Sequence, residues 1–273
     1  MNRGNGLPSD QNRKPSRVGV VGASGQLGSA LCERLAGLGC DLALCGIDGL
    51  EQDKLAERLR EGWQISATAS LADVTQPDSL AAFFASIDDP LPAKGANWVV
   101  INAGIGSARP QGDYLESADT IDNLVSVNFL GCLNAIRASV SWLSRIDGGR
   151  IIVVSSLASL AGSPENPAYA ATKAGIRVAC LSMQPALAKR KIAFTLAHPG
   201  FLSERTQDGG SNWRPFAMSP DAAADRIVRA ALGGRAETAF PWQMAWFVRA
   251  MAMVPAGLRQ RIYGRVSGDP EAA

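Results

Sequence analysis

Residues 18–28 read Val-Gly-Val-Val-Gly-Ala-Ser-Gly-Gln-Leu-Gly, an apolar run that leads into three spaced glycines. A helical pattern of apolar residues follows from Leu27 to Leu38. Glycine permits a tight turn and close approach of the backbone to a pyrophosphate, while the helix N-terminus offers free N–H groups to that anion. The context therefore predicts a dinucleotide-binding turn, with a simple packing turn as the alternative. The loop residues expected to contact the dinucleotide are Gly22, Ser24, Gly25, Gln26, Leu27 and Gly28.

The same alternation of apolar runs and helical patterns continues along the chain. Continuously apolar strands are typical of a parallel sheet whose two faces are both covered by helices. The sequence thus predicts an α/β fold with a doubly wound parallel sheet. The further apolar runs lie at 42–44, 65–69, 98–101, 151–154 and 193–197, and the longest helical patterns at 117–143 and 168–189.

Two local signals predict details of the helices. Thr75-Gln76-Pro77-Asp78 has the spacing of a capping box, which predicts that a helix begins there. Pro185 interrupts the pattern of 168–189 and predicts a kink or an early end, because proline removes a backbone donor and clashes with the preceding turn.

Three regions are expected in the chain. Residues 1–16 carry Gly, Pro, Asn and charge without an apolar stretch, so they are predicted to be a flexible leader and not a signal peptide. Residues 17–241 are expected to form one dinucleotide-binding and catalytic domain, and 242–273 a helical, apolar C-terminal extension and tail. No apolar run reaches the roughly 18 residues of a membrane-spanning helix.

Composition excludes several classes of protein. The chain has 273 residues, of which 47% are apolar, and its formal net charge of +2 is too small to indicate nucleic-acid binding. Five cysteines without CxxC spacing fit reduced thiols in a cytoplasmic protein. The only histidine, His198, favours neither a metal site nor a Ser-His-Asp triad. Its place in an apolar strand, directly before Pro199 and Gly200, predicts a structural residue.

A possible acid–base group lies between the later strands. Ser155 and Ser156 end a predicted strand, and Tyr169 and Lys173 follow one helical turn apart, on one face of a helix. A nearby lysine ammonium favours the phenolate form of a tyrosine, which makes the phenol a usable proton donor or acceptor near neutral pH. Taken alone, the same spacing also fits an ordinary surface helix.

Together with the glycine loop, these residues form an ordered series. Its other members are Asp73 and Val74, Asn102-Ala103-Gly104, Asn128, and Pro199 and Gly200. In order and spacing, over residues 17–200, the series resembles the short-chain dehydrogenase/reductase family. The resemblance implies a seven-stranded Rossmann-like domain that binds NAD(H) or NADP(H) and assembles as a homodimer or homotetramer.

The resemblance also implies residue roles. Tyr169 corresponds to the general acid/base, and Ser156 to the hydroxyl that binds the substrate oxygen. Lys173 corresponds to the residue that binds the nicotinamide ribose and favours the tyrosine phenolate, and Asn128 to the holder of a proton-relay water. Further coenzyme contacts are implied at Asp73, Val74, Asn102, Ala103, Gly104, Pro199 and Gly200.

The chain departs from the family pattern at the glycine loop. Val21 and Gln26 replace a threonine and a glycine of the shorter branch, and the GxxGxxG spacing instead resembles the extended branch of sugar-nucleotide epimerases. That branch needs a larger C-terminal domain, whereas only 73 residues follow Gly200. After Pro199, Glu204 stands where the family often has a threonine, and Thr206 is the expected substitute.

Coenzyme choice is read from the end of the second strand. An acid there binds the free ribose 2′-OH of NAD, and a base binds the 2′-phosphate of NADP. Gly46 stands at the acidic position, Ile47 at the basic one, and Asp48 lies further along the loop. These residues predict a weak choice between NAD(H) and NADP(H), with a slight preference for NADP(H) because Gly46 leaves room for the phosphate.

The C-terminal part is rich in aromatic residues, including Trp213 and Phe216, which indicates an apolar pocket or a buried interface. Residues 200–218 are expected to form a mobile lid. The segment 242–265 contains four arginines and no acid. It predicts an oligomer or intramolecular interface, with peripheral membrane contact as the alternative.

The leading functional hypothesis is an NAD(P)-dependent oxidoreductase that interconverts a carbonyl and a secondary alcohol on a small to medium, partly apolar substrate. The alternatives are a sugar-nucleotide-modifying enzyme and a catalytically weak nucleotide-binding regulator. A cytoplasmic location is expected, with possible peripheral attachment to a membrane surface.

Overall fold

The computed structural model describes residues 14–87, 95–110, 112–203, 216–255, 257–259 and 261. These residues form a seven-stranded sheet in the order β3-β2-β1-β4-β5-β6-β7, and every neighbouring pair of strands is parallel. The predicted doubly wound, Rossmann-like fold is therefore confirmed. The first strand begins at Pro15, two residues before the expected domain boundary, because Pro15 already pairs with Ala96.

The strands are β1 (Pro15–Val21), β2 (Asp41–Gly46), β3 (Ala67–Leu71), β4 (Ala96–Ile101), β5 (Gly149–Val154), β6 (Ile192–Pro199) and β7 (Glu237–Phe240). The helices are α1 (Gln26–Ala36), α2 (Gly49–Trp63), α3 (Pro77–Ser86), α4 (Ala118–Leu124), α5 (Cys132–Arg145), α6 (Pro167–Ala188), α7 (Pro220–Leu232) and α8 (Trp242–Met253). Two short helical segments, η2 (Val125–Gly131) and η3 (Leu157–Ser159), complete the described elements.

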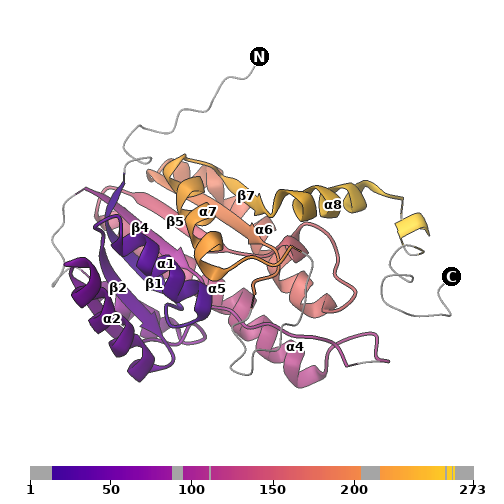
Figure 1. The fold of residues 1–273 in the computed structure, drawn as a ribbon, viewed down its shortest axis with the longest axis horizontal. Coiled ribbons are helices and arrows are strands. Elements are labelled where there is room, and N and C mark those ends of the chain that lie inside the picture. Colours follow the sequence, from indigo (N-terminus) through magenta and orange to yellow (C-terminus); the bar gives the residue numbers. More distant parts are fainter. Residues whose placement is uncertain are drawn as a thin grey trace, which may run out of the picture.

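Helices cover both faces of the sheet (Figure 1). Successive strand residues point to opposite faces, so Val20 packs in the core with α1, α2 and α7, whereas Val21 packs with α3, α5 and α6. Both cores are apolar, which explains why the strands read as continuous apolar runs.

The topology brings the predicted site residues to one edge. The chain moves from β1 to β2 and β3 on one side, and β4 then returns to the other side of β1. Ligands of doubly wound sheets bind at such a switch point, outside the carboxyl ends of the strands. The glycine loop follows β1, Asn102 follows β4, and Ser156 follows β5, so all three lie at this edge.

The long helical pattern of 117–143 is not one regular helix. It consists of α4, a π-helical segment η2 and α5. A π-helical turn leaves the apolar pattern nearly unchanged, so the sequence does not reveal it, yet such turns are frequent at functional sites. By length and composition Ala118–Arg145 could span a membrane. Buried side chains such as Ile136 and Trp142 place it in the core instead.

Two details of the helices differ from the predictions. Helix α3 begins at Pro77, where the sequence predicts a helix start, but Thr75 does not cap it, because the Thr75 hydroxyl donates to Asp73 Oδ1 at 2.8 Å. Helix α6 also does not end early at Pro185 but continues to Ala188. The buried side chain of Leu187 holds this last turn against the core, so the loss of one backbone donor is tolerated.

Candidate active site

The glycine loop has the shape expected of a phosphate-binding turn. Gly22 has a φ of +82°, and a Cβ added to it would lie 2.5 Å from Ala103 N. A Cβ on Gly28 would lie 2.3 Å from Gly22 O, so both glycines are required by close backbone packing. A Cβ on Gly25 would meet open space. Gly25 precedes α1 without a side-chain cap, so the helix N-terminus is left open to an anion.

The other predicted loop residues divide into two groups. Ser24 and Gln26 are exposed beside Gly25 and can face a ligand. Leu27 is buried and packs in the core. Leu27 therefore anchors the first turn of α1, and only its backbone remains available to a phosphate.

The loop after β4 is tied to the glycine loop. Asn102 Nδ2 donates to Gly22 O at 2.8 Å, and the N–H groups of Asn102 and Ala103 both donate to Val21 O. These bonds fix the two loops at the switch point.

Gly104 places this loop beside two predicted catalytic residues. A Cβ on Gly104 would lie 3.0 Å from Asn128 Oδ1 and 3.1 Å from Lys173 Nζ. Asn128, in η2, bonds both the N–H and the carbonyl of Ile105 at 2.8 Å. Lys173 Nζ donates to Val154 O at 3.4 Å and lies 5.8 Å from the centre of the Tyr169 ring. The structure thus brings Asn128, Tyr169 and Lys173 together.

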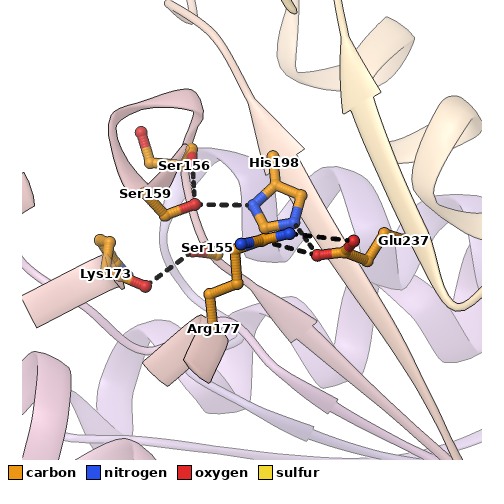
Figure 2. Close-up of polar contacts among 7 residues, drawn as sticks. All are labelled: Ser155, Ser156, Ser159, Lys173, Arg177, His198 and Glu237. Atoms are coloured by element: carbon orange, nitrogen blue, oxygen red, sulfur yellow. Dashed lines mark hydrogen bonds and ion pairs between the residues drawn. The ribbon is translucent and has the colours of Figure 1, made fainter. Parts of the chain in front are cut away.

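Ser156 lies on the turn that follows β5. Its Oγ accepts a hydrogen bond from Ala158 N at 3.2 Å and so caps the short helix η3. The neighbouring Ser155 Oγ donates to Lys173 O at 3.4 Å, which joins this turn to α6. Figure 2 shows the Ser156 hydroxyl on the side of the turn that faces away from His198.

A residue without a signal in the sequence caps α6, the helix that carries Tyr169 and Lys173. The buried Glu116 accepts hydrogen bonds from the N–H groups of Ala168 and Tyr169, at 3.1 and 3.3 Å, and from Ser107 Oγ at 2.9 Å. Burial acts to raise the pKa of Glu116, but these bonds outweigh it and hold the pKa below its ordinary value. An ionised carboxylate therefore fixes the first turn of α6, which carries Tyr169.

The residues expected to choose the coenzyme lie at the end of β2. A Cβ on Gly46 would lie 2.3 Å from Gln52 Nε2, so the side chain of Gln52 fills this space. Gln52 is fully buried, and neither of its amide atoms makes a hydrogen bond within the described residues. Ile47 is exposed, and Asp48 caps α2 by accepting a hydrogen bond from Glu51 N. The sequence pattern gave no signal for Gln52.

The predicted adenine contacts follow β3. Asp73 Oδ1 accepts hydrogen bonds from the N–H and the hydroxyl of Thr75, both at 2.8 Å. Val74 is buried, and a Cβ on Gly131 would lie 2.6 Å from its Cγ2, so Val74 packs tightly on η2. Asp73 is partly exposed and remains the more accessible of the two.

Pro199 ends β6 at the same edge, and Gly200 follows it. Gly200 N donates to Phe240 O at 2.8 Å, and a Cβ on Gly200 would lie 3.1 Å from Pro241 Cδ. The two ends of the proposed lid meet, since Met218 N donates to Phe201 O at 3.0 Å. The expectations for Glu204, Thr206 and Trp213, and for most of the lid, lie outside the described residues.

The fold is a domain of the doubly wound class, and its switch-point edge carries the hydroxyl of Ser156, the phenol of Tyr169 and the ammonium of Lys173. A family model described as short chain dehydrogenase matches residues 16–214. An uncharacterized oxidoreductase of Mycobacterium tuberculosis is 30% identical over 254 residues, which cover 90% of this chain and 96% of the relative. The chain therefore belongs to the short chain dehydrogenase family, and the resemblance seen in its sequence is confirmed.

Solved structures show the same fold. An alcohol dehydrogenase from Thermococcus sibiricus, complexed with 5-hydroxy-NADP, is 24% identical with a TM-score of 0.70, and the match covers 82% of this chain and 95% of that chain. A bulky-bulky ketone specific alcohol dehydrogenase from Comamonas testosteroni is 23% identical with a TM-score of 0.71, and the match covers 89% and 96%.

Proposed function

We propose that this chain is an NAD(P)-dependent oxidoreductase that interconverts a carbonyl and a secondary alcohol on a small to medium, partly apolar molecule. The observation that carries the proposal is that Lys173 Nζ and Asn128 Oδ1 both lie next to Gly104, in the loop that Asn102 bonds to the glycine loop. The coenzyme supplies hydride chemistry when it is bound. Tyr169 then donates or accepts the proton of the substrate oxygen, and Ser156 holds that oxygen by a hydrogen bond.

The residues at the switch point fit a dinucleotide. The uncapped N–H groups after Gly25 suit the pyrophosphate, and the open space at Gly25 lets it approach. Lys173 would bind the hydroxyls of the nicotinamide ribose, while Asn102, Ala103 and Gly104 would flank the adenosine. Asp73 would meet the adenine, with Val74, Pro199 and Gly200 completing the edge.

A panel of aldehydes and ketones, assayed with NADH and with NADPH, tests this function. The proposal expects coenzyme oxidation that depends on a carbonyl compound. Turnover of sugar nucleotides alone would favour the epimerase-like alternative, and coenzyme binding without any turnover would favour a regulator. The alcohol dehydrogenases among the solved structures support the carbonyl class as the first to screen. All five cysteines are free and buried, which supports a cytoplasmic enzyme.

We expect coenzyme choice to be weak, with a slight preference for NADP(H). Gly46 carries no carboxylate that would repel a 2′-phosphate, and no base stands at Ile47 to bind one. The dissociation constants of NADH and NADPH should therefore differ by less than about 1000-fold, or ~4 kcal/mol. A larger ratio, measured by fluorescence titration, would show that another residue discriminates between the coenzymes.

A matched pair of variants tests the effect of a negative charge at position 46 on NADPH binding. Gly46→Ala and Gly46→Asp both insert a Cβ next to Gln52, but only the aspartate adds a negative charge. NADPH affinity should fall at least about tenfold further in the aspartate variant than in the alanine variant.

The C-terminal helix supports a proposed homodimer or homotetramer. Figure 1 shows α8 extending away from the sheet. Its Ala245 and Met251 are buried, whereas Trp246 is 70% and Phe247 is 55% exposed. Exposed aromatic residues of this kind dominate protein interfaces when a partner covers them. Contact with an anionic membrane surface is the alternative. It is favoured by the arginines of residues 242–261, because no acidic residue in that range neutralises their charge.

Replacing both Trp246 and Phe247 with serine should dissociate the oligomer, while turnover should fall less than in Tyr169→Phe. Sedimentation velocity and vesicle pelleting give the readout, and Trp63→Ser, on α2, controls for the loss of an exposed tryptophan. A variant that stays assembled but no longer pellets with anionic vesicles would assign α8 to the membrane. A variant unchanged in both assays would rule out both roles.

A further inference from the structure

A series of polar side chains lies behind the predicted catalytic serine, buried at Ser159 and His198 and partly exposed at Glu237 and Arg177 (Figure 2). His198, in β6, is fully buried, and its Nδ1 lies 2.8 Å from Ser159 Oγ. Its Nε2 lies 3.2 Å from Oε1 of Glu237, the first residue of β7. Arg177, in α6, donates to both oxygens of that carboxylate, at 2.8 and 3.3 Å. Both nitrogens of the imidazole therefore have a hydrogen-bond partner.

At one end, this series of polar side chains reaches Ser156 through Ser159. Ser159 Oγ donates to Ser156 O at 2.6 Å, and Ser159 N donates to the same carbonyl at 3.0 Å. These bonds close the η3 turn, in which Ala158 N donates to Ser156 Oγ. The position of the Ser156 hydroxyl thus depends on the turn, and the turn depends on where Ser159 is held.

The hydrogen atoms in this series of polar side chains can be assigned from the charge states of Glu237 and His198. Burial acts to raise the pKa of Glu237, but Arg177 holds it below its ordinary value, so the carboxylate accepts a hydrogen from His198 Nε2. Burial lowers the pKa of His198, and the facing Glu237 offsets this effect only in part. A neutral ring with its hydrogen on Nε2 leaves Nδ1 as an acceptor. The single hydroxyl hydrogen of Ser159 is then shared between His198 and Ser156 O.

We propose that His198 is a positioning residue for Ser156, because its imidazole, braced by Glu237 and Arg177, fixes Ser159 and thereby the turn that carries the serine. The imidazole acts through Ser159, since the Ser156 hydroxyl lies on the other side of the turn (Figure 2). The inference rests on the proposed function, in which Ser156 binds the substrate oxygen.

His198→Leu removes both bonds of the imidazole and tests the proposal. We expect kcat for carbonyl reduction to fall between about tenfold and about 100-fold, because small displacements of a reacting group cost that much, while coenzyme affinity stays within about twofold. His198→Asn keeps a side-chain amide near the place of Nδ1 and should restore most of the loss. Ser159→Ala, which removes a single hydroxyl, should lower kcat in the same way if the leucine variant does not fold.

The decisive comparison uses Ser156→Ala as the background. His198 acts through Ser156, so adding His198→Leu to Ser156→Ala should cause no further loss of kcat. A further loss equal to that in the wild type would overturn the proposal, because it would show a general structural effect. Ser139→Ala is the control, since Ser139 is a buried serine in α5 whose hydroxyl donates to Ala135 O at 2.6 Å. It should leave kcat unchanged.

The outcomes separate the two proposals. If Ser156→Ala and Tyr169→Phe strongly lower turnover but His198→Leu and Ser159→Ala keep it, the positioning role is wrong and the proposed function stands. If Ser156→Ala itself retains full turnover, the proposed active site fails first, and the role of His198 fails with it.

Discussion

Replacing Tyr169 with phenylalanine should lower turnover by about 100-fold or more and leave coenzyme affinity unchanged. The phenol lies on the same face of α6 as Lys173, and the variant removes only the oxygen that transfers the proton. Steady-state kinetics with the best carbonyl compound from the panel, together with coenzyme titration, measures the effect.

Tyr114→Phe is the matched control, because it removes the same phenolic oxygen from a tyrosine that is 91% exposed and lies outside α6. It should keep normal turnover. If Tyr169→Phe also kept near-normal turnover, the acid–base role of Tyr169 would be wrong, whatever the substrate.

Lys173→Ala should weaken coenzyme binding and catalysis together. The ammonium is buried between Val154 O and Gly104. In the proposed function, its loss would deprive both the ribose and the phenol of one partner. We expect the coenzyme dissociation constant to rise at least about tenfold, and kcat to fall at least about 100-fold. Fluorescence titration and single-turnover kinetics measure the two effects separately.

Lys189→Ala, at the exposed end of the same helix, controls for the loss of one positive charge. It should bind coenzyme and turn over normally. If Lys173→Ala raised only the KM for the substrate, the expected contact of Lys173 with the ribose and its expected effect on the Tyr169 phenol would both be wrong.

The sheet could be predicted from the sequence because it is buried on both faces. Strands such as Val18–Val21 and Ile151–Val154 then read as unbroken apolar runs between helical patterns. The site edge followed from the same pattern, since the glycine loop, Asn102 and Ser156 each come directly after a strand. Parallel strands bring such residues to one edge without any further information.

Other features depend on contacts between distant side chains. Glu116 caps a helix 52 residues further along the chain, and Ser159 meets His198 across 39 residues. No local pattern links these pairs, so single-sequence reasoning can place each residue only as a loop or strand-end residue. The π-helical turn at Asn128 likewise leaves no trace in the apolar spacing.

The end of β2 shows again that a local pattern does not reveal contacts between side chains. The sequence pattern places Gly46 at the position expected to discriminate between the coenzymes and predicts free space beside it. The structure fills that space with Gln52, which lies one helical turn into α2 and carries no motif of its own.

The most direct test of the account follows a label from coenzyme to product. The wild-type chain is incubated with a carbonyl compound from the panel and with NADPH or NADH in which both hydrogens at C4 of the nicotinamide are deuterium, and the alcohol is analysed by mass spectrometry. The account predicts one deuterium on the carbinol carbon, formed at a rate that Tyr169→Phe lowers by about 100-fold or more. Alcohol without the label, or labelled alcohol formed equally fast by Tyr169→Phe, would contradict it.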